Sequence, residues 1–102
     1  SLLTHVRKGD ISNVHSLRRG AAEAIEVTAH GDAYSSKVVG RRLDEIQLPE
    51  GVTIGAIVRG EEVVIAHKHV VVETDDHVIL FLVDRRKISA VEKLFAVGFG
   101  FF

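Results

Sequence analysis

The 102-residue chain contains no cysteine, no methionine and no tryptophan, and it has a single proline. The absence of cysteine excludes disulfide bonds, zinc sites built on thiolates and cysteine nucleophiles. With one proline and no serine-rich or glutamine-rich stretch, the sequence shows no sign of a disordered linker. Because the chain begins at Ser1 and lacks methionine altogether, we expect it to be a fragment or a processed piece of a longer protein.

The chain also lacks a surplus of either charge. It has 13 Lys and Arg residues against 14 Asp and Glu residues, and its net charge is −1. Nucleic-acid binding usually depends on a basic surplus, so we expect no nucleic-acid partner, and a DNA-binding module of the swapped-hairpin type is disfavoured. No apolar run reaches the roughly 18 residues of a membrane-spanning helix. The hydrophobic content of 46% is typical of one folded domain.

The first half of the chain shows strand patterns followed by a helical one. Residues 1–10 are weakly helical in pattern, and we expect them to be the end of a preceding helix or a linker. Apolar and polar residues alternate in 11–17 and in 22–30, which predicts two strands joined by a turn at 18–20. Residues 35–46 place apolar side chains at helical spacing and predict a short helix.

The second half is richer in β-branched residues. Strands are predicted at 52–58 and 63–66, joined by Gly60 and Glu61 as the central residues of a type II′ turn, which favours glycine first. Residues 70–73 predict an extended segment or edge strand. Residues 77–83 are nearly all apolar, which predicts a strand covered on both faces.

A final helix is predicted from its cap at Asp84 to about residue 95, with an apolar stripe facing the core. Residues 97–102 form an apolar, glycine-broken tail. These elements predict an α+β fold over 11–96, with a small mixed or antiparallel β-sheet, a short helix and a closing C-terminal helix.

Histidines and aspartates near the middle of the chain raise the question of a metal site. His67 and His69 point the same way on an extended segment, and Asp75, Asp76 and His77 follow closely. The chain has no cysteine and no helical histidine motif, so the alternative of a polar, solvent-facing strand end is favoured. We predict no metal site.

Enzymatic chemistry is also disfavoured. No Gly-x-Ser-x-Gly elbow is present, and Asp75 and Asp76 point apart on an extended chain, which makes a poor acid–base pair. We therefore predict no catalytic residue. No phosphate-binding loop is found, although arginine side chains suit phosphate. The residues predicted to hold a polar ligand such as a nucleotide between protomers are Arg42, Arg59, His67 and His69.

The apolar strands need cover on both faces, and one helix covers one face of a small sheet. Either the remaining helix and the N-terminal strands complete the cover, or a partner does. For the second alternative, the predicted interface residues are Ile54, Ile57, Val63, Ile65, Phe99, Phe101 and Phe102.

Residues 48–66, LPEGVTIGAIVRGEEVVIA, resemble the signature of the C-terminal lobe of RCK domains, also called the TrkA-C domain. That signature reads leucine-proline-x-glycine, an apolar pair, Ala-Ile-x-Arg and a glycine turn. Residues 40–46 resemble the short helix that precedes it. The chain departs from the family at Ala66, where a proline is usual, and at Asp75, where a glycine often stands.

The resemblance implies a regulatory, non-catalytic lobe of a cytoplasmic subunit that is peripheral to the inner membrane. Such subunits form homo-oligomeric rings and gate a potassium-uptake transporter in the membrane. NAD or ATP would bind a preceding lobe whose glycine fingerprint is missing from this chain, so no cofactor is expected here. The alternative is a nucleotide-sensing or ion-sensing domain of another transporter regulated in this way.

Overall fold

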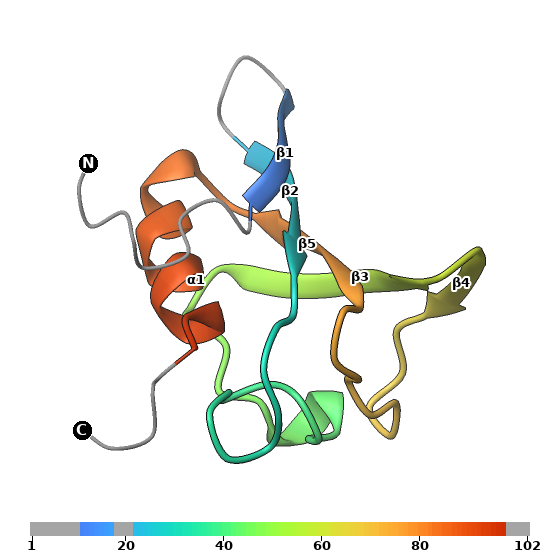
Figure 1. Ribbon diagram of the computed structural model, residues 1–102. Coiled ribbons are helices and arrows are strands. Elements are labelled where there is room, and N and C mark those ends of the chain that lie inside the picture. Colours follow the sequence, from blue (N-terminus) through green and yellow to red (C-terminus); the bar gives the residue numbers. More distant parts are fainter. Residues whose placement is uncertain (1–10, 18–21, 98–102) are drawn as a thin grey trace.

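In the described part of the chain, five strands form one antiparallel sheet with a helix against one face (Figure 1). The computed structural model describes residues 11–17 and 22–97. The strand order across the sheet is β1-β2-β5-β3-β4. The elements are β1 Ile11–Leu17, β2 Ala22–Thr28, β3 Val52–Arg59, β4 Glu62–Ile65, β5 His77–Leu82 and α1 Ile88–Phe95. The predicted α+β class is confirmed, and the sheet is antiparallel throughout.

Several predictions fall outside the described residues. They are the helix end or linker at 1–10, the turn at 18–20, and the apolar tail apart from Val97. Apart from the extended segment at 70–73, the strands predicted within the described ranges are confirmed to within two residues, since β2 ends at Thr28 and β4 begins at Glu62.

The β3–β4 hairpin turns on the two predicted central residues, because Arg59 pairs with Glu62. Gly60 has φ +64°, whereas Glu61 is not among the residues with positive φ. A positive φ at the first central position alone is the pattern of a type II′ turn, whose twist matches the flanking strands.

The two faces of the sheet differ in their cover. On the central strand β5, Val78, Leu80 and Leu82 are buried, whereas Phe81 on the opposite face is 46% exposed. Within a single chain, the strand predicted to be covered on both faces is therefore covered on one face only. A strand alternates its side chains between faces, and α1 packs on only one of them.

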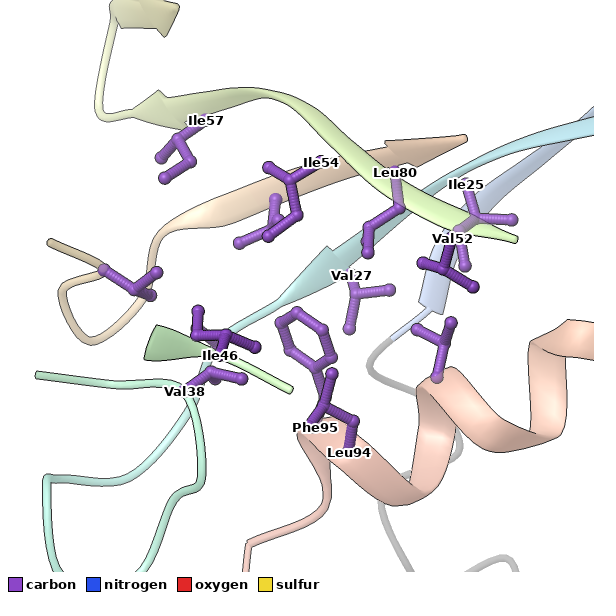
Figure 2. Close-up of a cluster of buried hydrophobic side chains, with 14 of the residues drawn as sticks. Ile25, Val27, Val38, Ile46, Val52, Ile54, Ile57, Leu80, Leu94 and Phe95 are labelled. Atoms are coloured by element: carbon purple, nitrogen blue, oxygen red, sulfur yellow. The ribbon is translucent and has the colours of Figure 1, made fainter. Parts of the chain in front are cut away.

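α1 closes the core by placing Val91, Leu94 and Phe95 against the sheet. Figure 2 shows Phe95 reaching from α1 toward Val27 of β2 and toward Ile46. Burial of such a side chain stabilises the fold by roughly 1.5–3 kcal/mol. The predicted cap is confirmed, because the Asp84 carboxylate accepts a hydrogen bond from the backbone N–H of Arg86 at 2.8 Å. The first turn, Arg85–Lys87, is a 3-10 helix.

The helix predicted at 35–46 was wrong except for a short 3-10 helix at Leu43–Glu45. The Ser36 hydroxyl accepts hydrogen bonds from the N–H groups of Val38 and Val39, which satisfies the backbone locally without a helix. Gly40 then takes φ +84°, a left-handed conformation that breaks any helix. Val38 and Val39 are still buried, so the apolar pattern marked core residues although it misidentified the element.

Residues 68–72 run alongside the 40–44 segment, joined to it by backbone hydrogen bonds such as that from Gly40 N–H to Val72 O at 2.8 Å. The extended segment predicted at 70–73 is present only as one isolated bridge, between Arg42 and Val71. Asp75, at a position where the family it resembles often has glycine, has φ +71°. Among the described residues it is the non-glycine residue with positive φ, and its N–H donates to Ala29 O at 2.6 Å.

Candidate functional site

The sheet face turned away from α1 is the candidate functional surface, and we call it the outer face. The register sets its composition: Ala56 lies opposite Ile65 and Ile79, and Val58 lies opposite Val63 and His77. The described side chains of the outer face are Ala24, Glu26, Thr28, Thr53, Ala56, Val58, Val63, Ile65, His77, Ile79 and Phe81.

The outer face is apolar and open on the side of the β3–β4 hairpin. Val63 and Ile65 of β4 are 61% and 60% exposed, and Phe81 of β5 is 46% exposed. Figure 1 shows the hairpin projecting away from α1, which leaves β4 at the edge of the sheet. Contiguous exposed apolar side chains on a sheet face and its edge strand are typical of protein contact surfaces.

A β-bulge sets the position of Phe81. The β3–β5 register shifts between Ile54 and Ala56, so Gly55 is the extra residue. A Cβ atom at Gly55 would overlap the Phe81 ring, which means that the ring lies directly on the glycine backbone. Because Gly55 has no side chain, the half-exposed Phe81 ring packs directly against its backbone, and this contact fixes the position of the ring.

One close histidine–carboxylate contact lies within the apolar outer face. His77 Nδ1 is 2.8 Å from Glu26 Oε2, and the two side chains are 42% and 28% exposed. Thr28 Oγ1 lies 3.4 Å from the same ring nitrogen. Because Glu26 lies opposite Ile79 and His77 opposite Val58, apolar residues border this pair on the sheet.

The predicted interface residues separate into three groups. Val63 and Ile65 lie on the outer face and are exposed. Ile54 and Ile57 are 8% and 0% exposed in the core, so their prediction as exposed surface was wrong. The bulge at Gly55 turns both of them to the core face. The residues at 99, 101 and 102 lie outside the described ranges.

Sequence reasoning missed Ile79 and Phe81. They alternate with the buried Val78 and Leu80, and this alternation of neighbours on one strand was the available signal. It was hidden because every residue from 78 to 83 is apolar, so composition alone does not distinguish the two faces.

Of the residues predicted to bind a ligand, Arg59 is occupied by an internal partner. Its Nε and Nη2 each donate to the Asp76 carboxylate at 2.9 Å, and Nη2 also donates to Val71 O at 3.0 Å. The hydrogen bond to Asp76 raises the pKa of Arg59 above its usual value. Arg42 pairs with Asp44, its Nε lying 3.0 Å from Oδ1.

The remaining two predicted ligand residues, His67 and His69, are exposed. His67 lines an open cleft of about 230 Å³, but Arg42, Arg59 and His69 do not. The structure therefore does not bring the four predicted residues together. The cleft is also smaller than the roughly 300–1,000 Å³ of typical small-molecule sites. Its lining is Leu43, Asp44, Leu48, Thr53, Ile54, Ala66, His67 and Lys68.

The histidines and aspartates considered above for a metal site do not form one. Among the described residues, no group of three or more His, Asp or Glu side chains could hold a metal ion. Asp76 is bound by Arg59, and His77 faces Glu26. Asp75 lies 3.8 Å from His30 Nδ1. Separately, no helix of the described ranges is long and apolar enough to cross a bilayer.

Comparison with known proteins gives the family. The model of the TrkA-C domain matches residues 32–96, which include β3, β4, β5 and α1. The chain is 71% identical over 102 residues to the Trk system potassium uptake protein TrkA of Halomonas elongata, covering all of this chain and 22% of that protein. It is 66% identical over 95 residues to the protein of the same name from Vibrio alginolyticus, covering 93% of this chain and 21% of that protein. The chain thus spans about a fifth of the length of these relatives, and it belongs to the TrkA-C domain family.

Proposed function

We propose that this chain is a non-catalytic regulatory module of a potassium-uptake system and that it acts by assembling with copies of itself through the outer face. The observation that carries this proposal is the open apolar strip of Val63, Ile65 and Phe81 on a sheet whose other face is covered by α1. Similarity to TrkA potassium uptake proteins supports the potassium-uptake context.

Self-assembly suits this surface physically. An isologous contact places the same patch of both chains face to face, so a central apolar strip meets itself. Each square ångström of apolar surface removed from water contributes about 25 cal/mol. The net charge of −1 gives two copies little mutual repulsion.

Regulation follows from linkage in this scheme. An effector changes gating only by the free energy with which it favours one assembled state over another. In the whole protein, NAD or ATP would bind a preceding lobe, and the change in assembly would reach a membrane-embedded potassium transporter subunit. The working location is then cytoplasmic and peripheral to the inner membrane. In this scheme the module transforms no substrate, and its role is to supply the surface through which the chains assemble.

The test is sedimentation of the 102-residue chain over a concentration series. We expect reversible self-association, and we expect the double substitution Val63→Asp with Ile65→Asp to weaken it at least about tenfold, since it would bury unpaired charge. Val71→Asp is the matched control, because Val71 is 42% exposed but lies outside the sheet. A chain that stays monomeric at high micromolar concentration would overturn the proposal, as would equal effects of both variants.

A further inference from the structure

Within the described part of the chain, β4 is an edge strand that pairs with β3 alone. Its exposed side chains Val63 and Ile65 belong to the outer face. We propose that β4 pairs antiparallel with β4 of a second copy, so that Val63 of each chain lies opposite Ile65 of the other and the two sheets join along this edge. This inference rests on the proposed function, to which it adds the segment and the register of the contact.

The β3–β4 hairpin fixes which backbone groups of β4 reach the open edge. Ala66 N–H donates to Gly55 O at 3.4 Å, so Ala66 directs its backbone groups toward β3. These directions alternate along an antiparallel strand, so Val64 also faces β3, whereas Val63 and Ile65 direct their N–H and C=O groups outward. Among the described residues no other segment hydrogen-bonds with these outward groups. Such an edge is a template for pairing with a further strand.

The charges that flank β4 favour an antiparallel partner of the same sequence. Glu61 precedes the strand and Glu62 begins it, and His67 and Lys68 follow it. All four side chains are exposed, and in the described ranges none of them forms a salt bridge. Antiparallel pairing brings the acidic end of each strand beside the basic end of the other, whereas parallel pairing would bring like charges together.

The outward backbone groups also select the register. Strands form hydrogen-bonded pairs only where outward groups of both chains meet, and within β4 these belong to Val63 and Ile65. Val63 opposite Ile65 gives two such pairs, one on each side of the two-fold axis, and each pair exchanges two bonds. Either residue opposite its own copy gives one pair within β4. The proposed register therefore makes the most hydrogen bonds and also places the exposed apolar side chains of both copies side by side.

Two substitutions at one position separate the backbone contact from the side-chain contact. Ile65→Pro and Ile65→Ala both lose the isoleucine side chain, but only proline removes the outward N–H, and proline is tolerated on an edge strand. In sedimentation of the 102-residue chain, we expect Ile65→Pro to associate at least about tenfold more weakly than Ile65→Ala, since each dimer loses two hydrogen bonds. Urea unfolding checks that both variants fold. Equal dissociation constants would overturn the edge pairing and leave assembly through the outer face intact.

Because the chain has no cysteine, single introduced cysteines report the register. In the proposed register Val64 lies opposite its own copy in a non-hydrogen-bonded pair, with Cα atoms about 4.5 Å apart and within disulfide range. Val63 and Ile65 lie two positions from their own copies. Under air oxidation, Val64→Cys should therefore form disulfide dimers at least about fivefold faster than Val63→Cys or Ile65→Cys, although Val64 is the least exposed of the three.

The outcomes of the cross-linking experiment separate the two proposals. Faster cross-linking at position 63 or 65, or equal rates at all three positions, would overturn the register and with it the edge pairing. A wild-type chain that stays monomeric at high micromolar concentration would overturn the proposed function itself.

Discussion

Arg59, the last residue of β3, donates two parallel hydrogen bonds of 2.9 Å to the carboxylate of Asp76, which lies just before β5. Asp76 is 1% exposed, and its Oδ2 also accepts the backbone N–H of Glu73 at 2.8 Å. These bonds connect the two residues that flank the 16-residue segment from Gly60 to Asp75, which contains β4 and its connection to β5. Arg59 is thus a structural residue, and this explains why it is not available to a ligand.

Arg59→Met should lower the free energy of unfolding by about 3 kcal/mol, because it leaves the Asp76 carboxylate buried without its cation. Urea unfolding measures the loss. The control is Arg42→Met, which breaks the half-exposed pair with Asp44 and should cost about 0.5 kcal/mol or less. Equal losses in the two variants would contradict the structural role of Arg59.

Ile57 and Ile65 give a matched test of the two faces, because the same residue type is 0% exposed at one position and 60% exposed at the other. Ile57→Ala should destabilise the chain by about 3–4 kcal/mol through lost burial and a cavity. Ile65→Ala should cost about 0.5 kcal/mol or less in folding and should weaken self-association instead. Thermal and urea unfolding, followed by sedimentation, separate these effects; a large folding loss at Ile65 would argue against the register.

Gly55→Ala should displace the ring of Phe81, which lies on the glycine. Overpacking of this kind costs about 1–2 kcal/mol. In a Phe81→Ala background the new methyl group meets no ring, so most of the cost should vanish. A double-mutant cycle on urea unfolding measures this coupling, and additive effects would show that the two residues do not touch.

The stability of the chain should depend on pH through Asp84. The Arg86 side chain, and then its backbone N–H, hold the pKa of the Asp84 carboxyl below its usual value. A carboxyl with a lowered folded-state pKa stabilises the fold above its ordinary titration range, near pH 4, and this stabilisation is lost as the pH falls through the folded-state value.

We therefore expect Asp84→Asn, which retains a capping side chain, to narrow the difference in urea midpoint between about pH 7 and about pH 3. The effect is small because the carboxyl is partly exposed to solvent. A variant whose midpoint falls with pH as steeply as that of the wild type would contradict the assignment.

The sequence located the strands well because alternation and turn residues are local. The Gly60-Glu61 hairpin followed from the preference of glycine for the first central position, and the last helix followed from the cap at Asp84. The same local reasoning failed at 35–46. There the Ser36 hydroxyl accepts a backbone hydrogen bond from Val38, and Gly40 has a left-handed conformation, so the backbone forms turns and not a helix. The apolar spacing there reflected burial of Val38 and Val39 and did not reflect a helix.

By itself the sequence determined the class of fold, the positions of the five strands and the last helix, and the family signature at 48–66, since these depend on patterns between neighbours. Only the tertiary structure decided which apolar residues remain exposed. Simple alternation places Ile54 and Ile57 on opposite faces, but the bulge at Gly55 turns both inward. Arg59 likewise meets a partner 17 positions away that no local pattern reveals. Exposure and pairing are set by register across the sheet, and register is a relation between distant segments.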